Sequence, residues 1–292
     1  NQKAIKADEV EVGSEQDGYN KDYLVGANRI FYYDASKNWW SRNGVPTNMP
    51  EGEPGGPDSE VFYDFGTTHN KQFGEFCHPN CDCGRFLEIG NSVFMAYKKT
   101  GQGFEPLPKP NVDFGGGLER ISAAQLGDPD VFKISLLWPI IEGLEELSGK
   151  VYAEHQQSMR VIADHLRAAT WLAVDGVMPS NKEQGYVVRR LLRRAIRFAF
   201  DLGIQQDLCL KVVPIVASQY KDFAEVEKSK DAIAQAFDKE EKTFRQTLRK
   251  GIVEFDKLIT IKDGGDFAWD SQHWDSPEIE KLPLTGEKAF KL

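Results

Sequence analysis

Three consecutive glycines, Gly115 to Gly117, divide the sequence into two stretches of different character. Residues 111–114 before them favour a short strand, and residues 118–126 after them favour a helix that ends at Gly127. Glycine lets the backbone turn sharply and approach a ligand closely, and the N–H groups that open a helix favour anions. The stretch therefore predicts a strand–turn–helix beside an anionic ligand. An ordinary flexible connection has the same glycines, so both interpretations stay open on this stretch alone.

The residues before the glycines carry the pattern of a sheet. Residues 1–22 are polar and acidic and predict an irregular lead-in, whereas residues 43–58 are rich in proline and glycine and predict a loop. Residues 61–63 and 86–97 are rich in aromatic and aliphatic side chains, which favours strands. A hairpin-like sheet is the natural combination of these strands.

The residues after the glycines carry helical periodicity. Apolar side chains recur at steps of three and four in residues 156–175, which predicts an amphipathic helix that ends at Gly176. Further helices are predicted over residues 128–148 with a bend at Pro139, 181–202, 237–259 and 285–292. The predicted fold class is therefore α+β, with a sheet-containing domain over residues 1–130 and an all-helical domain over residues 131–292.

The composition limits the classes of function. The net charge of −9 argues against a general nucleic-acid coat but permits a local basic surface. No apolar run reaches membrane-spanning length and no signal-peptide pattern is present, so we expect a cytoplasmic protein without a membrane partner. The four cysteines, three of them within residues 77–83, do not resemble a secreted disulfide framework.

An arginine-rich run occupies residues 189–197. On a helix, Arg189, Arg193 and Arg197 would share one face, with Arg190 and Arg194 beside them. A solvated charged face is the ordinary interpretation of such a run. No acidic residue lies four positions away within the run, so the arginines repel one another unless an anion neutralises them. The run therefore favours a surface that binds phosphates.

Asn181 lies just before the arginine run. Ser180 with Glu183 fits a capping box, and Asn181 with Gln184 fits one shifted by a residue, so a helix cap is one interpretation of Asn181. An asparagine also offers the donor and the acceptor that read a base edge, and A-form RNA displays such edges in its shallow minor groove. Cap and base reader both stay open.

Cys77, Cys81 and Cys83 are close enough in sequence to bind zinc, and His78 lies among them. The Cys-x-Cys spacing is tighter than that of the usual zinc finger, and no second ligand group follows downstream. Three reduced thiols in a loop are the alternative, and zinc is a candidate cofactor.

Four further residues have the chemistry of a small polar pocket: Trp40, Glu88, Asn91 and Asp113. A large ring can wall such a pocket, an amide can orient its ligand, and a carboxylate can pair with a cation. Glu88 and Asn91 are three residues apart, so in a regular strand they face opposite sides. Only a bulge would bring both to one pocket.

Three blocks of the sequence resemble one family. VDFGGGLERIS, residues 112–122, resembles motif 3 of the class II aminoacyl-tRNA synthetases. Together with RFLEIGNSVFMAY upstream and RVIADHLRAATWLAVDGVMPSNKEQGYVVRRLLRRAIR downstream, it resembles the alanyl-tRNA synthetases, with gaps, from about Asn38 to the C-terminus. The resemblance implies an antiparallel sheet that carries the active site, followed by a helical tRNA-recognition domain.

The resemblance also implies a reaction. Alanine would be activated with ATP, accompanied by Mg²⁺, to alanyl-adenylate and then transferred to the 3′ end of tRNA(Ala). Arg120 and Asp113 would be the catalytic residues, Arg120 through the ATP γ-phosphate. Alanine would be held by Asp113, Asn91 and Trp40. Gly115 and Gly117 would let adenine lie against the backbone.

In the same family comparison, Asn181 would read the G·U pair of the acceptor stem, whose guanine amino group lies in the minor groove. The RNA backbone would be held by arginines of the run, namely Arg189, Arg190, Arg193, Arg194 and Arg197. The implied partners are therefore the acceptor stem of tRNA(Ala), alanine and ATP.

The sequence departs from the family in three places. Motifs 1 and 2 are not found in residues 1–37, and motif 2 supplies the arginine that grips the α-phosphate, so we expect this chain alone to be inactive. Asp58 stands where many relatives have Cys. Gly90 stands where many have Trp, which would reshape the alanine pocket unless Trp39 fills the space. The chain is thus expected to be an internal segment of a longer synthetase. The alternatives are a non-catalytic module that binds the acceptor stem and a zinc-stabilised structural domain.

Overall fold

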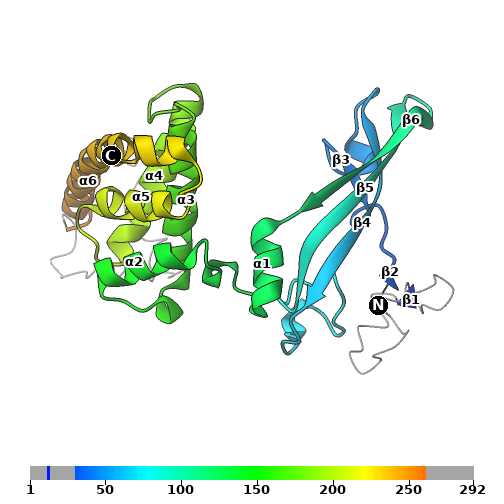
Figure 1. Cartoon of the computed structure of the whole chain (residues 1–292), viewed down its shortest axis with the longest axis horizontal. Helices are drawn as coiled ribbons and strands as arrows, with labels where there is room; N and C mark the ends of the chain where they lie inside the picture. Colours follow the sequence, from blue (N-terminus) through cyan, green and yellow to red (C-terminus); the bar gives the residue numbers. More distant parts are fainter. Residues whose placement is uncertain (1–11, 14–29, 261–292) are drawn as a thin grey trace. The chain divides into compact units, whose positions relative to one another are not determined.

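The computed structural model describes Val12–Gly13 and residues 30–260 of the 292-residue chain. The chain divides into two compact units, Asn1–Leu137 and Trp138–Leu292 (Figure 1). The first contains an antiparallel sheet, and the described residues of the second form helices and their connections, which confirms the α+β class. The division after Leu137 lies a few residues beyond the predicted boundary at residue 130. The helix expected over residues 285–292 and nearly all of the expected lead-in lie outside the described residues.

An antiparallel sheet of strand order β3-β4-β5-β6 forms the first unit. Its strands are β3 (Trp39–Ser41), β4 (Pro54–Asp64), β5 (Phe86–Thr100) and β6 (Gly103–Gly116). Two short strands, β1 (Val12–Gly13) and β2 (Ile30–Phe31), precede this sheet in the sequence and pair with each other in parallel. The loop predicted over residues 43–58 is wrong from Pro54 onward. Pro54 is the first residue of β4 and Pro57 lies within a register shift, the two places where a paired strand tolerates proline.

The triple glycine ends β6 and opens a helix, as predicted. Gly115 and Gly116 are the last residues of β6, and Gly117 is the N-cap of α1 (Leu118–Leu126). Gly127 closes α1 in the left-handed conformation, with φ of 73°, which a glycine adopts without a steric penalty. This strand–turn–helix therefore places Arg120 in the first turn of α1, directly after the last pairs of the sheet.

Within residues 138–260, five helices of the second unit pack around an apolar core. They are α2 (Trp138–Ser148), α3 (Gln156–Val174), α4 (Glu183–Asp201), α5 (Leu208–Ser218) and α6 (Ala224–Thr260). α3 packs on α4, and α5 packs on α6 and α2. The fully buried side chains that hold these helices together include Ile140, Ile162, Leu166, Leu192, Ile196, Val212 and Phe237. The predicted period-three-and-four pattern of residues 156–175 is thus confirmed as the buried side of α3.

The predicted helix over residues 128–148 is interrupted. Asp130 caps only a 3-10 turn, Val131–Lys133, and α2 begins separately at Trp138. Pro139 therefore stands in the first turn of α2 rather than at a bend within one helix. Proline is favoured there because its missing N–H would have no intrahelical partner.

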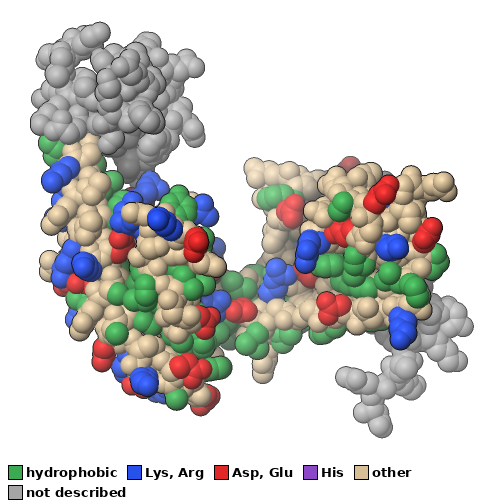
Figure 2. All heavy atoms as spheres, turned by 90° about the horizontal axis from the view of Figure 1, so that it is seen from above, with side chains coloured by type: hydrophobic (Ala, Val, Ile, Leu, Met, Phe, Trp, Pro, Cys, Tyr) green, Lys and Arg blue, Asp and Glu red, His purple; other side chains and the backbone are tan. Residues whose placement is uncertain are grey.

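The two units differ in how far they bury their apolar side chains. Figure 2 shows hydrophobic side chains exposed over the sheet unit. By their exposure, more than half of the large exposed apolar residues described in this unit belong to β4, β6 and α1. The exposed ones include Val61, Tyr63, Val112, Phe114, Leu118, Ile121 and Leu126. None of the helices in the described ranges is long and apolar enough to cross a membrane.

Candidate functional site

Two rows of side chains run across the sheet on one face. Asp58 of β4 pairs with Val93 of β5, and Val93 pairs with Asp113 of β6. Two residues further along, Glu60 pairs with Asn91, and Asn91 pairs with Gly115. Directly paired residues of neighbouring strands point to the same side, and so do residues two apart in one strand. Three of the predicted site residues, Asn91, Asp113 and Gly115, therefore share a face with two carboxylates that the prediction omitted.

Asn91 and Asp58 form a hydrogen bond but keep unused acceptor atoms. The Nδ2 group of Asn91 donates to Oδ2 of Asp58 at 3.0 Å. Oδ1 of Asp58 and Oδ1 of Asn91 are both buried and have no hydrogen-bond partner among the described residues. An unsatisfied buried acceptor costs about 1–3 kcal/mol. This pair is therefore suited to a ligand that brings N–H donors.

The carboxylates give this face a negative potential. The pKa of Glu60 is raised above its ordinary value by burial and by the negative charges of Glu88 and Asp58. Glu88 lies close to this face because the register shifts between Val61 and Phe62, where Val61 pairs with Gly90 but Phe62 pairs with Glu88. The bulge that the spacing of Glu88 and Asn91 required is thus present in β5.

Arg120 reaches back from α1 to the same strand. Its Nη1 group donates to Oε2 of Glu88 at 2.8 Å and to the carbonyl oxygen of Glu88 at 3.1 Å. Its side chain lies against Gly117, where an added Cβ would come within 3.1 Å of the Arg120 Cδ. The guanidinium side chain is 48% exposed, so it is open to a ligand. At Gly115 an added Cβ would meet no atom within 4 Å, so the backbone of the strand end is also open.

Trp39 and Trp40 have different surroundings. Trp39 stacks on Tyr97, contacts Phe104 and donates its Nε1–H to the sulfur of Met49 at 3.4 Å. Trp40 pairs with Gly56, two residues before Asp58, and is 44% exposed. Trp39 is thus occupied in packing, and Trp40 is the ring left open for a ligand.

The space beside Gly90 is filled by Phe114. A Cβ on Gly90 would come within 3.1 Å of the Phe114 ring. The expectation that Trp39 would fill the space next to Gly90 is therefore wrong, because Trp39 packs on Tyr97 and Phe104 instead. Gly90 and Phe114 are each one residue from a member of the Asn91–Gly115 row, so alternation turns them to the opposite face of the sheet.

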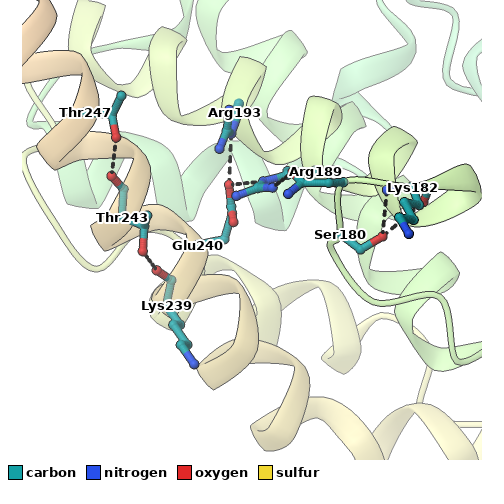
Figure 3. A network of polar contacts seen from close by, with 9 residues as sticks. Ser180, Lys182, Arg189, Arg193, Lys239, Glu240, Thr243 and Thr247 are labelled. Atoms are coloured by element: carbon teal, nitrogen blue, oxygen red, sulfur yellow. Dashed lines mark hydrogen bonds and ion pairs between the residues drawn. The ribbon is translucent and has the colours of Figure 1, made fainter.

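The arginine-rich run lies on α4 and is split between two roles. Arg189 and Arg193 each donate through Nε to one carboxylate oxygen of Glu240 on α6, at 2.8 and 2.9 Å (Figure 3). Arg193 also lies over the ring of Phe244. Arg190, Arg194 and Arg197 are exposed, and no carboxylate in the described part of the chain forms an ion pair with them. The carboxylate of Glu240 thus neutralises part of the positive charge of the run. The remaining charge, on Arg190, Arg194 and Arg197, lies on the exposed face of α4.

Asn181 is exposed and does not cap α4. The N-cap of α4 is Lys182, without a side-chain hydrogen bond, while Ser180 bonds to both backbone groups of Lys182. Both capping-box predictions are therefore wrong, and Glu183 in fact has a positive φ of 49°. The Asn181 Oδ1 instead accepts a hydrogen bond from Nη1 of Arg189. A carbonyl oxygen has a second lone pair, so this contact orients Asn181 and still leaves it an acceptor.

Cys77, Cys81 and Cys83 come together with a fourth residue, His69. One ligand atom from each lies within 4.8 Å of all the others, so this group could hold a metal ion. Burial raises the pKa of the Cys77 thiol to about 12, with a further contribution from Cys83. Burial also acts to raise the pKa of Cys83, but hydrogen bonds led by that from His69 lower it to about 6. His78, which lies among the cysteines in sequence, contacts Tyr33 instead.

Four residues of these clusters were not predicted from the sequence, namely Asp58 and Glu60 as a pair, His69 and Glu240. The alternation of β4 could have placed Asp58 and Glu60 on one face, but the register with Asn91 depends on two shifts that the composition does not show. His69 lies upstream of the cysteines, and their spacing alone does not point to it. Glu240 is 47 residues beyond Arg193, so only the packing of α4 against α6 reveals it.

Comparison with known proteins adds independent findings. The model of the class II tRNA synthetases (A) matches residues 3–270. The alanine–tRNA ligase of Shouchella clausii is 40% identical over 242 residues, which are 82% of this chain and 26% of that protein. That of Treponema pallidum is 36% identical over 80% of this chain and 38% of that protein, and that of Methylococcus capsulatus is 40% identical over 92% and 28%. The chain spans between about a quarter and two fifths of the length of these relatives.

Proposed function

Because the chain belongs to the class II tRNA synthetases (A), we propose that it is a working part of an alanine–tRNA ligase. In this proposal alanine reacts with ATP to give alanyl-adenylate and pyrophosphate, and the alanyl group is then transferred to the 3′ end of tRNA(Ala). The sheet unit supplies one wall of the activation site, and the helical unit supplies a surface for the acceptor stem. The similarity to curated alanine–tRNA ligases does not favour the alternative of a non-catalytic module.

The observation that supports this proposal most strongly is the pair of unsatisfied oxygens on the sheet face. The ammonium group of alanine has three N–H donors, and Oδ1 of Asp58 and Oδ1 of Asn91 are two buried acceptors without partners. Asp113 stands across Val93 from Asp58 and adds a second negative charge. Val93 is buried between them and offers an apolar surface for a methyl group, with the open ring of Trp40 as a wall. Charge and size therefore both suit alanine.

ATP would bind at the end of the sheet, with Mg²⁺ as its counterion. Gly115 leaves open space beside the strand end, which lets a flat base approach the backbone. Arg120 already lies beside Glu88 and is half exposed, so it is placed to exchange part of this contact for a phosphate oxygen. Arg120 would thus hold the γ-phosphate, and pyrophosphate would leave toward it.

The acceptor stem would bind along the outer face of α4. Arg190, Arg194 and Arg197 recur there at steps of four and three, a spacing that lines one side of a helix and can follow a phosphate backbone. In the proposal, Arg189 and Arg193 support this face through Glu240, and Arg189 also orients Asn181. Asn181 would accept a hydrogen bond from the guanine amino group of a G·U pair.

Two further elements complete the proposal. Zinc would be held by the His/Cys group as a structural ion, separate from the Mg²⁺ that accompanies ATP. The reaction would take place in the cytoplasm.

The sheet-face proposal is tested by binding of a non-hydrolysable sulfamoyl analogue of alanyl-adenylate, followed by calorimetry. We expect the chain to bind it, and we expect Asp58→Asn and Asp113→Asn each to weaken binding by about tenfold or more, the equivalent of about 1.4 kcal/mol. Asp222→Asn removes an exposed carboxylate from the helical unit and is the matched control. Equal affinity in all four proteins, or no binding at all, would contradict the proposal.

A further inference from the structure

The connection between β4 and β5 runs from residue 65 to residue 85 with a single 3-10 turn, Lys71–Phe73, as its regular structure. Its two ends are tied by Arg85, which donates to both carboxylate oxygens of Asp64 at 2.7 and 2.9 Å. Loops of this length without regular structure are uncommon unless something else orders them. Within it, two of the cysteines, Cys77 and Cys81, are buried.

The four donor atoms in this loop lie within 4.8 Å of one another, and two of the distances between them fit the edges of a small tetrahedron. Sγ of Cys77 lies 3.6 Å from Sγ of Cys83, and Sγ of Cys81 lies 3.8 Å from Nδ1 of His69. Zinc binds thiolate sulfur at about 2.3 Å and imidazole nitrogen at about 2.0–2.1 Å, which gives a tetrahedron with edges of about 3.5–3.8 Å. These two distances therefore match opposite edges of a tetrahedral zinc site.

The imidazole of His69 is oriented for such a role. Its Nε2 lies 2.9 Å from the carbonyl oxygen of Gly74, which can only accept, so Nε2 carries the proton. Nδ1 then presents its lone pair toward the sulfurs. A metal-binding histidine characteristically donates its other N–H to a carbonyl or carboxylate in this way, which fixes both the tautomer and the ring.

We propose that His69, Cys77, Cys81 and Cys83 bind one zinc ion, which orders the β4–β5 connection. This inference rests on the zinc of the proposed function, to which it gives four ligands and a role, but it does not depend on the ligase reaction. Three sulfur donors and one nitrogen donor favour zinc over Mg²⁺ or Ca²⁺, which prefer oxygen. Four protein ligands leave no open position, so the ion is structural. The ion would also connect the loop to the sheet face. Asn80 lies between Cys77 and Cys81, and its side chain hydrogen-bonds to Glu60.

Metal analysis of the whole chain tests this proposal without RNA or substrate, so its result is independent of the ligase proposal. We expect one zinc per chain after expression with zinc and removal of loosely bound metal. His69→Ala and Cys81→Ser should weaken zinc binding by more than the roughly 10–100-fold that loss of a supporting hydrogen bond produces. His69→Cys keeps a fourth donor and should retain the ion, which separates lost ligation from lost folding.

Cys209→Ala is the matched control, because Cys209 is buried in the helical unit. It should bind zinc as the unaltered chain does. The proposal is overturned if the unaltered chain binds no zinc or binds iron in its place. It is also overturned if His69→Ala retains zinc with unchanged affinity, or if His69→Cys loses it as completely as His69→Ala.

Discussion

Glu60 is the carboxylate on the sheet face whose environment most opposes its charge. Burial, followed by Glu88 and Asp58, raises its pKa, and the side chain of Asn80 acts in the opposite direction. A ligand ammonium placed beside Asp58 and Asn91 would relieve this repulsion. At the scale of single residues, therefore, the carboxylates of the sheet face repel one another, and a cationic group beside them would reduce this repulsion.

The raised pKa of Glu60 predicts a pH dependence of stability. Between the ordinary pKa of 4.5 and the raised value, folded Glu60 keeps a proton that the unfolded chain has released. The free energy of unfolding should therefore fall as pH rises through this window and stay lower above it. Glu60→Gln should remove this fall and stabilise the sheet unit at neutral pH. The free energy of unfolding is measured by denaturant unfolding, monitored by tryptophan fluorescence, at pH values between about 4 and 8.

Glu105→Gln, an exposed change on β6, is the control and should leave the pH profile unaltered. A profile that is the same for Glu60→Gln and the unaltered chain would show that Glu60 does not feel its neighbours.

The residue types of the site were predictable, but their partners were not. Asn91, Asp113, Gly115 and Arg120 stand in recognisable blocks, and the structure brings them to one end of β5 and β6. That Asp58 joins them depends on the register of β4, which is set by shifts at Gly55 and Val61. A shift of one residue turns a side chain to the other face, so composition alone could not place it.

At the scale of elements, three of the glutamates on α6 have clearly different surroundings. Glu227 pairs with Lys230 on the surface of its own helix. Glu240 joins α6 to α4 through two arginines. Glu241 is 1% exposed, accepts from the backbone N–H groups of Leu208 and Cys209 at the start of α5, and pairs with Arg245. From Glu227 to Glu240 to Glu241, the carboxylate therefore becomes more buried, and the last two bond to groups on other helices.

Replacing each of these glutamates with glutamine should destabilise the helical unit in this order. Glu227→Gln should cost less than about 0.5 kcal/mol, as expected for an exposed pair. Glu240→Gln should cost about 1.5–3 kcal/mol, since two charge-assisted hydrogen bonds are weakened. Glu241→Gln should cost about 3–5 kcal/mol, because it leaves Arg245 buried without its counter-charge. Urea unfolding followed by circular dichroism gives the three values, and equal losses would contradict this ranking.

Helical periodicity predicted α3 and α4 well because each buries one continuous stripe. It predicted α6 only from residue 237, whereas the helix begins at Ala224, and Ile252 of the predicted apolar stripe is exposed. It did not predict α5, whose Pro214 lies inside the helix and whose polar groups are satisfied by Glu241 from α6. It also predicted one arginine face on α4, with Arg189 and Arg193 as members. The division of the arginines into supporting and exposed groups depends on Glu240, a contact between elements distant in the sequence.

At the scale of the whole molecule, the sheet unit holds two buried acceptors without partners and one half-exposed arginine, Arg120, to which the proposed function assigns an ammonium and a phosphate. The sheet unit also exposes several large apolar side chains, among them Val112, Phe114 and Leu118, and exposed apolar patches commonly mark contact surfaces. The family resemblance places a second arginine, for the α-phosphate, in a motif not found in residues 1–37. In the proposed function, the described sheet is therefore one wall of an activation site.

This arrangement predicts that the chain alone does not activate alanine at a useful rate. Loss of a transition-state contact of this kind costs about 10²–10³ in rate. We expect alanine-dependent exchange of labelled pyrophosphate into ATP to be indistinguishable from a reaction without alanine. Robust exchange by the isolated chain would show that this chain already contains every phosphate-binding group that the reaction needs, which would contradict the proposal of a partial site.

The helical unit offers the most direct measurement of the central claim, that this chain is part of an alanine–tRNA ligase. Binding of acceptor-stem hairpins with a G·U or a G·C pair is measured by fluorescence anisotropy over a range of salt concentrations. Arg190→Gln and Arg194→Gln should each reduce the salt slope by about one, and Lys211→Gln, a charge removed elsewhere, should not. The unaltered chain should prefer the G·U stem, and Asn181→Ala should lose about 1–3 kcal/mol of this preference. Equal binding of both stems, or equal slopes for the arginine variants and Lys211→Gln, would contradict the account.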